Sequence, residues 1–371
     1  MPSRIAFVAL SRSLGGLELT TLRLASAFHA RGIAVTVVCP PDSPLAERAI
    51  ARGLDRLEVK PKYRYGDPAA AWRVRREIIA RGITDIVILQ SKEIGLFSLS
   101  TIDLPGVRLF FYQQMQSGIH KKDLLHRMTH GRLHKWITLT EKMKAETLAT
   151  TTIPERKTVV VPLGIDEIRF DPALYNAARS KRFFTRKKVP VIGLIGRLDP
   201  QKGQKEFVLA ADAFFKAHGK RSALFVMIGE ESRGEHGFSN EITALIESRG
   251  LQDDVRMLPF TDNVPELLAG LDILTMPSYA ETYGLILLEA MAMKKPVIAT
   301  AAGGVPELLR DRVEGLLIPP RDSESLFRAI DELVTKPRFR VTLGANGRKR
   351  VIENFRFESC VDRLQTILAA S

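Results

Sequence analysis

Short hydrophobic runs alternate with longer amphipathic stretches from one end of the chain to the other. In the first half, the runs cover residues 5–10, 33–38, 86–89, 107–112, 137–139 and 159–161. The β-branched residues between Gly32 and Pro40 are typical of a strand, whereas residues 17–30 have the apolar spacing of a helix. Strands that alternate with helices predict parallel βαβ units.

The alternation stops once and then starts again. Residues 179–188 contain six basic residues and no acidic one, and Pro190 follows, so we predict an exposed linker or domain edge there. Further strands are predicted at 191–195, 224–228, 254–258, 273–276 and 297–300, and helices at 206–217, 241–248, 285–293, 306–309, 324–334 and 358–370. A chain of 371 residues is long enough for two domains. The pattern therefore predicts two doubly wound domains, residues 1–178 and 190–355.

Cysteine content and apolar run length bear on the compartment. Cys39 and Cys360 are the only cysteines, which is too few for a disulfide framework and favours a reducing cytoplasm. The apolar run at 5–10 is short for a signal peptide, and no uncharged stretch approaches the ~20 residues of a membrane span. We expect a protein that is neither secreted by this route nor transmembrane.

Charge changes the picture because it is unevenly distributed. Residues 1–200 contain 33 Lys/Arg and 18 Asp/Glu, whereas residues 201–371 contain 22 and 24. Such a basic half suggests an anionic partner: nucleic acid, an acidic membrane surface or a phosphorylated acceptor. Aromatic residues lie within the basic segments 60–64, 72–76, 121–132 and 179–188 or beside them, namely Tyr63, Tyr65, Trp72, Phe183 and Phe184. This mixture suits an anionic membrane interface and equally an ordinary solvated surface.

Two glycine-containing turns follow predicted strands, where open α/β sheets bind their ligands. Gly15 and Gly16 open the first helix and allow a ligand to approach the backbone amides closely. In the second domain, the run from Gly196 to Gly203 places Arg197 at a strand end and Lys202 at a helix start. Two cations and a helix N-terminus together predict a cradle for a diphosphate.

The segment from Glu281 to Glu289 carries the most informative chemistry. Glu281 follows the strand at 273–276, and Gly284 allows a tight turn into the next helix. Glu289 lies further along that helix within an otherwise apolar stretch, where a carboxylate is costly to bury without a partner. The hydroxyls of a ribose would satisfy Glu289, and Glu281 could contact a sugar; a salt bridge is the alternative for Glu289.

These motifs resemble those of glycosyltransferase family 4. The similarity lies in Glu281 and Glu289 with seven residues between them, the Gly-Arg-Leu…Lys-Gly run at 196–203, and Ala-Gly-Gly-Val-Pro-Glu at 302–307. The resemblance implies a GT-B fold of two Rossmann-like domains facing a deep cleft. It also implies a retaining transferase of hexosyltransferase type that uses a nucleoside-diphosphate sugar, and a last helix, about 356–371, that packs back on an acceptor-binding first domain.

The resemblance also implies roles for individual residues. Glu289 would bind the ribose, Glu281 the transferred sugar, and Arg197 and Lys202 the diphosphate. Backbone amides near Gly15 and Gly16 and from Tyr283 through Gly284 to Leu285 would assist, and the base would lie against Phe260 and Thr261. The sequence has no Asp-x-Asp pair, so we expect neither a metal nor another cofactor.

One position departs from the pattern of the relatives. Many of them carry a histidine after a strand of the first domain, whereas here the strand at 107–112 is followed by Gln113 and Gln114, and His120 is the nearest imidazole. Either Gln114 or His120 would contact the sugar.

His126, His130 and His134 recur every four residues, which would place them on one helix face, but we expect no zinc site there because no carboxylate or cysteine completes a set.

The leading hypothesis is a transferase that adds a sugar to a cell-envelope acceptor, such as lipopolysaccharide core or a lipid-linked glycan. We expect it in the cytoplasm, including the inner face of the cytoplasmic membrane. An epimerase of nucleotide sugars would keep the fold, but the spacing of Glu281 and Glu289 speaks against it. A nucleic-acid-binding protein would rest on the basic half alone. We expect no nucleic acid partner because zinc-finger spacing and an aromatic RNP-type motif are both missing from the sequence.

Overall fold

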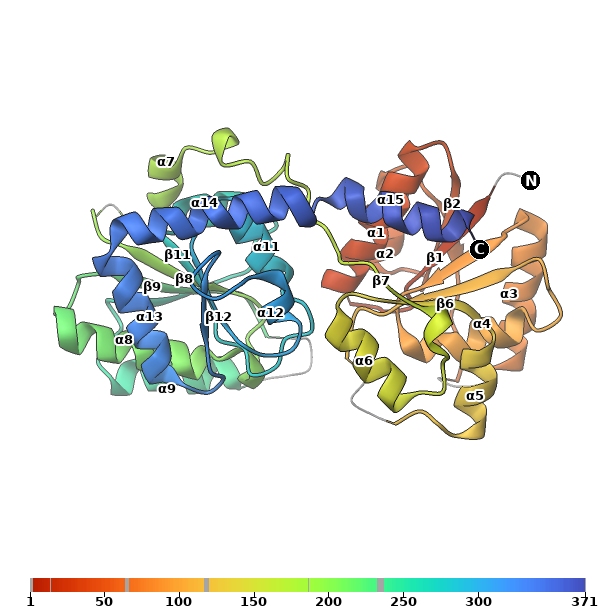
Figure 1. The fold of residues 1–371 in the computed structure, drawn as a ribbon, viewed down its shortest axis with the longest axis horizontal. Coiled ribbons are helices and arrows are strands. Elements are labelled where there is room, and N and C mark those ends of the chain that lie inside the picture. Colours follow the sequence, from red (N-terminus) through yellow and green to blue (C-terminus); the bar gives the residue numbers. More distant parts are fainter. Residues whose placement is uncertain are drawn as a thin grey trace. The chain divides into compact units, whose positions relative to one another are not determined.

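The computed structural model describes residues 3–13, 15–63, 67–116, 120–185, 187–231 and 237–370. It divides into two compact units (Figure 1). The first comprises Met1–Pro162 with Cys360–Ser371, and the second comprises Leu163–Ser359. Arg64, Tyr65 and Arg186, which belong to the basic segments or lie beside them, are outside the described residues.

The first unit is built on a parallel sheet with the strand order β3-β2-β1-β4-β5-β6-β7. Its strands are β1 (Arg4–Val8), β2 (Ala34–Cys39), β3 (Asp55–Glu58), β4 (Asp85–Ile88), β5 (Arg108–Tyr112), β6 (Leu133–Thr138) and β7 (Thr158–Val160). Its helices are α1 (Gly16–Ala30), α2 (Pro44–Ala51), α3 (Pro68–Arg81), α4 (Ile94–Ser100), α5 (Leu124–Gly131) and α6 (Glu141–Thr150). The last helix, α15 (Phe357–Ala369), belongs to this unit from Cys360 onward.

The second unit repeats the same topology with the order β10-β9-β8-β11-β12-β13. Its strands are β8 (Val191–Ile195), β9 (Leu224–Ile228), β10 (Val255–Leu258), β11 (Ile273–Met276), β12 (Val297–Thr300) and β13 (Leu316–Ile318). Its helices are α7 (Ala177–Lys181), α8 (Gln204–His218), α9 (Phe238–Ser248), α10 (Val264–Gly270), α11 (Leu285–Ala292), α12 (Val305–Leu308), α13 (Ser323–Thr335) and α14 (Pro337–Asn354). Both sheets have the Rossmann order, which confirms the prediction of two doubly wound domains.

The hydrophobic runs predicted the central strands well and missed two of the four edge strands. All the predicted strands are present, but β3 and β13, each at an edge of its sheet, were not predicted. In β3 only Leu57 is buried, because Asp55, Arg56 and Glu58 are exposed at the edge. A strand of this kind has no continuous apolar run, and therefore no hydrophobic signal.

The predicted linker at 179–188 is a packed part of the second unit. Residues Leu163–Ser359 form one unit, so residues 163–178, which were predicted to end the first domain, belong to the second unit instead. Ser180 and Phe184 are buried against Gly270, and Lys181 forms an ion pair with Asp272. The prediction of an exposed linker was therefore wrong in this respect, although Phe183 is exposed.

The three histidines at four-residue spacing do not share a helix. α5 ends at Gly131, so His126 and His130 are helical whereas His134 lies in β6. His130 packs edge-on against the rings of His126 and Trp136, and burial lowers its pKa to about 4. Within the described ranges, no group of three or more His, Cys, Asp or Glu residues is arranged to hold a metal ion.

The longest helix of the second unit, α14, was not predicted at all. Its sequence is polar and contains Gly344 and Gly347, both of which weaken a helix when judged alone. The structure explains both residues, because α14 packs against α11 at these positions. A Cβ at Gly344 would lie 2.2 Å from the carbonyl oxygen of Lys294, and one at Gly347 would lie 3.2 Å from the Met291 Cγ.

We expect Gly344→Ala to destabilise the second unit. The added methyl meets a backbone oxygen that cannot move independently, and overpacking of this kind typically costs about 1–3 kcal/mol. Gly95→Ala, in α4, is the control because its Cβ would enter open space. Urea denaturation followed by circular dichroism measures both. Equal stability of Gly344→Ala and wild type would contradict the close packing of α14 on α11.

Candidate active site

The strand order of the second unit places its ligand crevice between β8 and β11. From β8 the chain continues to β9 and β10 on one side, whereas β11, β12 and β13 lie on the other. Open α/β sheets bind ligands at such a switch point, beyond the carboxyl ends of the strands. The loops that follow β8 and β11 meet there, since the N–H of Tyr279 donates to the carbonyl of Gln201 at 2.8 Å.

An ion pair joins these two loops. The Nζ of Lys202 lies 2.8 Å from an Oε2 of Glu281, and the two side chains are 28% and 16% exposed. Their backbones are held close by Gly203, which has φ +76° and where a Cβ would lie 2.2 Å from the carbonyl oxygen of Pro277. Only glycine fits this contact. The structure therefore brings together a cation and a carboxylate that are 79 residues apart in the sequence.

Asp199 organises the turn that carries the two predicted cations. Its Oδ1 accepts the N–H of Gln201 at 2.8 Å and so starts the short 3-10 turn Pro200–Lys202. Its Oδ2 pairs with the Arg197 guanidinium at 2.6 Å, and the Arg197 side chain is 52% exposed. The Arg197 carbonyl accepts from the side-chain amide of the buried Gln204. Arg197 and Lys202 thus belong to one rigid turn at the crevice.

The loop from Glu281 to Gly284 is held by contacts with a second loop, which contains Gly303 and Gly304. Gly303 has φ +57°, and a Cβ there would lie 1.7 Å from the carbonyl oxygen of Glu281. The N–H of Gly304 donates to the same oxygen at 3.2 Å. The ring of Tyr283 is buried, and its hydroxyl donates to the carbonyl of Leu163 at 2.7 Å. The side chain of Tyr283 therefore holds the loop, and only its backbone could face a ligand.

α11 begins at this loop. Gly284 precedes its first residue with φ +89°, which a glycine adopts readily, and Leu285 is the first helical residue. Glu289 lies in the second turn and is half-buried. Both predicted glutamates thus belong to the same loop-and-helix unit, Glu281 just before the helix and Glu289 within it.

The predicted base-binding segment follows β10, at the edge of the sheet. The Phe260 side chain is 50% exposed, so one face of the ring is available for stacking. The hydroxyl oxygen of Thr261 accepts the N–H of Asn263 at 3.3 Å, which orders the turn after Phe260. Phe260 and Lys202 both follow the carboxyl ends of strands in this sheet. They are separated by one strand, β9, because β10 is two strands away from β8.

The corresponding crevice of the first unit, between β1 and β4, contains buried carboxyl groups. The N–H of Gly15 donates to the Glu18 Oε2 at 2.8 Å, and that of Leu10 donates to the Glu93 Oε1 at 2.6 Å. Glu18 and Glu93 are both buried. The Gly15 amide, which the sequence assigned to a phosphate, is thus already bonded to a carboxylate, and only the surroundings of Gly16 are open.

Glu93 is a functional candidate that the sequence analysis missed. It lines a cavity of about 260 Å³ with Leu10, Pro61, Tyr63, Asp67, Lys92 and Leu96. Its Oε2 has no hydrogen-bond partner among the described residues. Burial, with a smaller contribution from the charge of Glu18, raises the pKa of Glu93 to about 8, against the N–H of Leu10 and the charge of Lys92. The available signal was a charged residue in the loop that follows the apolar run at 86–89.

The two candidates for the sugar-contacting residue of the first unit differ in environment. Gln114 is half-buried after β5, and its Nε2 has no hydrogen-bond partner in the described part of the chain. His120 is exposed. The neighbouring Gln113 is structural, because its Oε1 accepts from the Trp136 indole and the Thr147 hydroxyl. This environment favours Gln114 over His120.

The comparisons identify the family. Residues 177–350 match the model of the glycosyl transferases group 1, and residues 14–169 match that of glycosyltransferase family 4. The two matches cover most of both units, and the chain belongs to the family 4 (group 1) glycosyltransferases, a family of transferase enzymes. The resemblance in the motifs around Glu281 and Glu289 is thereby confirmed.

Among curated proteins, the D-inositol 3-phosphate glycosyltransferase of Salinispora arenicola is 32% identical over 220 residues, covering 57% of this chain and 49% of that protein. An uncharacterized glycosyltransferase of Methanocaldococcus jannaschii is 26% identical over 231 residues, covering 60% of this chain and 56% of its own. The chain spans about half the length of the curated relatives it matches.

Solved structures of similar fold cover the whole chain. A glycosyltransferase from Rickettsia africae has a TM-score of 0.88 at 21% identity, covering 100% of this chain and 99% of its own. Anabaena HepE, in complex with UDP and glucose, has a TM-score of 0.84 at 18% identity over 100% of both chains. WaaG, a glycosyltransferase involved in lipopolysaccharide biosynthesis, has a TM-score of 0.73 at 20% identity over 99% and 100%. These likenesses confirm the predicted GT-B fold.

The position of Glu93 predicts an unusual pH dependence of stability. The free side chain ionises near pH 4.5 and the folded one near pH 8, so between these values the folded state holds a proton that the unfolded state has lost. Its contribution to the free energy of unfolding must then fall as the pH rises, by at most about 1.4 kcal/mol per pH unit. Glu93→Gln cannot ionise and lacks this slope.

Urea denaturation of wild type and Glu93→Gln between about pH 5 and pH 8 measures the effect. The free energy of unfolding of Glu93→Gln, relative to wild type, should increase over this range. Glu47→Gln, on the exposed face of α2, controls for the loss of a carboxylate and should run parallel to wild type. Parallel profiles for all three proteins would show that Glu93 ionises normally in the fold.

Proposed function

We propose that this protein transfers a sugar from a nucleoside-diphosphate sugar to a hydroxyl group of an acceptor, with the donor bound at the β8–β11 crevice. The observation that carries the proposal is the Lys202–Glu281 ion pair, at 2.8 Å, at the switch point of the second unit. A diphosphate would replace Glu281 as the partner of Lys202. Glu281 would then be released to accept hydrogen bonds from sugar hydroxyls.

The other residues at this sheet edge fit the remaining parts of such a donor. Arg197 shares its turn with Lys202 and would contact the diphosphate, together with amides at the start of α11 from Gly284 to Leu285. Glu289 would bind the ribose hydroxyls, and the exposed face of Phe260 would stack on the base beside Thr261. The buried ring of Tyr283 leaves only its backbone amide for the diphosphate.

The proposed reaction breaks the bond between the anomeric carbon of the sugar and a diphosphate oxygen. The acceptor oxygen forms the new bond to that carbon, and its proton leaves with the diphosphate. Charge develops on the departing diphosphate, so Arg197, Lys202 and the α11 amides would act mainly in the transition state. We propose that no metal is needed, because these cations and amides can supply the stabilisation by themselves. Retention of configuration is proposed from the resemblance to glycosyltransferase family 4.

For the acceptor, we propose a hydroxylated cell-envelope molecule bound by the first unit. Gln114 and Glu93, whose Nε2 and Oε2 lack protein partners in the described chain, could pair with acceptor or sugar hydroxyls. Relatives named D-inositol 3-phosphate glycosyltransferases also carry the name of a hydroxylated molecule, which supports this proposal. In addition, we propose contact with an anionic membrane surface through exposed aromatic and basic pairs such as Trp72 with Arg76 and Tyr63 with Lys62. None of the helices that the structure describes is long and apolar enough to cross a membrane.

The donor site is tested by thermal shift with UDP-glucose, GDP-glucose and ADP-glucose. One of the three should stabilise the wild type, by about 2.7 kcal/mol at a hundredfold excess over the dissociation constant. Lys202→Met should weaken that donor by about ten- to a hundredfold, because it removes a charge-assisted hydrogen bond to the diphosphate. Glu289→Ala should also weaken it by removing the ribose contact.

Lys205→Met is the matched control, because Lys205 lies on α8 close to Lys202 in sequence and pairs with Glu241 at 3.0 Å on the surface. It should bind the donor within about twofold of wild type, since surface ion pairs contribute little. Circular dichroism checks that each variant is folded. The proposal fails if no nucleotide sugar stabilises the wild type, or if Lys202→Met and Lys205→Met bind equally well.

A further inference from the structure

The backbone of Glu281 is held by a chain of contacts that reaches beyond its own loop. The carbonyl oxygen of Glu281 lies against Gly303 and accepts the N–H of Gly304 at 3.2 Å. Gly304 immediately precedes α12, so the position of this short helix fixes the two glycines. Any movement of α12 would therefore move the backbone behind Glu281.

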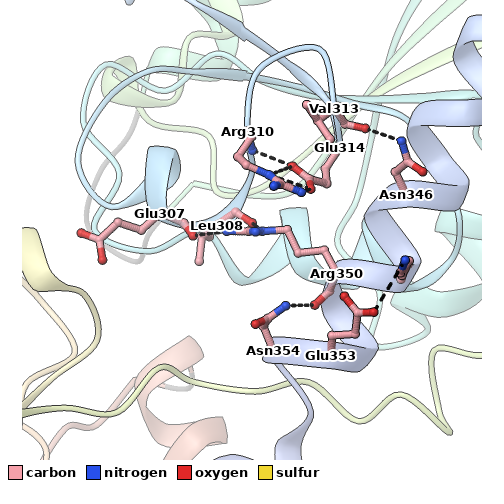
Figure 2. Close-up of polar contacts among 10 residues, drawn as sticks. Glu307, Leu308, Arg310, Val313, Glu314, Asn346, Arg350, Glu353 and Asn354 are labelled. Atoms are coloured by element: carbon pink, nitrogen blue, oxygen red, sulfur yellow. Dashed lines mark hydrogen bonds and ion pairs between the residues drawn. The ribbon is translucent and has the colours of Figure 1, made fainter.

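α12 is held at its other end by Arg350 of α14. The Arg350 Nε donates to the Leu308 carbonyl at 2.5 Å and its Nη2 to the Glu307 carbonyl at 2.9 Å (Figure 2). These are carbonyl groups at the C-terminal end of a helix, which has no intrahelical donors for them and favours a cation. A helix of four residues has little stability of its own, so the guanidinium supplies an important part of its fixation.

Arg350 itself comes from a helix that cannot shift easily. Gly344 and Gly347 bring α14 into close contact with the backbone and side chains at the end of α11. Arg348 donates to the carbonyl of Ala292, the last residue of α11, at 2.6 Å. α14 is therefore fixed to the helix that carries Glu289, while its Arg350 holds α12.

A buried carboxylate, that of Glu314, interacts electrostatically with Arg350. Glu314 is buried and pairs with Arg310, and Figure 2 shows this pair beside Arg350. Burial by itself raises the pKa of Glu314, but hydrogen bonds from Arg310 and the charges of Arg350 and Arg310 outweigh this and lower it. Glu314 therefore stays ionised, with Arg310 as its ion-pair partner and the positive charge of Arg350 as a further stabilising contribution.

We infer that Arg350 is a positioning residue for the donor site, acting through α12 and Gly303–Gly304 on Glu281. The inference rests on the proposed function, since it concerns the sugar-contacting role of Glu281. It assigns Arg350 to the sugar part of the donor and not to the nucleotide part. Loss of Arg350 should therefore weaken recognition of the sugar while leaving nucleoside-diphosphate binding intact.

The experiment compares Arg350→Met with Lys349→Met. Lys349 is the adjacent residue of α14, and both residues line a cavity of about 190 Å³. The Nζ of Lys349 lies 3.9 Å from the Oε1 of Glu353 on the surface. Both variants remove one positive charge from the same helical turn, but only Arg350 contacts α12. Isothermal titration with UDP and with UDP-glucose, or with the pair that the donor panel selects, gives two affinities for each protein.

For Arg350→Met we expect unchanged affinity for the nucleoside diphosphate and about tenfold lower affinity for the nucleotide sugar. The rate at which the protein hydrolyses the nucleotide sugar, measured as a third quantity, should also fall by about tenfold, because a displaced catalytic group lowers the rate. Lys349→Met should match wild type in all three measurements. Arg350→Lys should recover part of the loss, because a lysine can donate to one of the two carbonyls but lacks the planar guanidinium.

Gly303→Ala tests the contact between Gly303 and the Glu281 backbone directly, without changing α14. Its Cβ would lie 1.7 Å from the carbonyl oxygen of Glu281, so it should displace the loop and reproduce the selective loss of sugar recognition. This second variant keeps the test decisive if Arg350→Met is poorly folded.

Three results would overturn the inference. If wild type prefers the nucleotide sugar and Arg350→Met retains that preference, Arg350 has no positioning role although the proposed function stands. If Arg350→Met loses both ligands equally, together with a lower melting temperature, its role is general stability. If wild type binds neither ligand, the proposed function is wrong and the inference fails with it.

Discussion

The second unit is organised around one ion pair between loops that leave the sheet on different strands. Lys202 and Glu281 are both partly buried, and removing two charges from water is costly unless each is well paired. The pair therefore persists only because the two loops are held in register by contacts that do not involve the charges. Gly203 against Pro277 and Gly303 against Glu281 supply these contacts. The ion pair gives the site its chemistry, and the glycines give it its geometry.

Close contacts between backbone segments occur along the path that connects α14, α12 and the loop of Glu281. Gly203, Gly303 and Gly344 each stand where a Cβ would come within 2.2 Å of a carbonyl oxygen. Contacts between backbones leave little freedom, because neither partner can change rotamer to relieve a clash. The path from α14 through α12 to Glu281 is built from such contacts and from the two hydrogen bonds of Arg350. The proposed positioning role of Arg350 would allow a polar helix far along the sequence to act on the carboxylate of Glu281.

The crevices of the two units contrast in charge. The second unit presents Arg197 and Lys202 at its switch point, which suits an anionic diphosphate. The first unit is part of the basic half of the chain, yet its switch point contains the buried carboxyl groups of Glu18 and Glu93. Buried carboxyl groups offer hydrogen bonds to the hydroxyl groups of a ligand, which fits the acceptor proposed for this unit.

The sequence by itself determined the fold class and singled out the candidate donor-site residues of the second unit. Buried parallel strands are continuous apolar runs, so the central strands β8, β9, β11 and β12 were predicted at their actual bounds. Arg197 and Lys202 were singled out by their places at a strand end and a helix start, Glu281 by its loop after a strand, and Glu289 as a carboxylate within an apolar stretch. Only the tertiary structure showed that Lys202 and Glu281 form a pair, that the Gly15 amide is already bonded to Glu18, and that Glu93 lines a cavity. It also identified α14, whose glycines weaken the helix locally and are explained only by the close packing of α11. These features depend on contacts between distant segments, which no local pattern of hydrophobic and polar residues records.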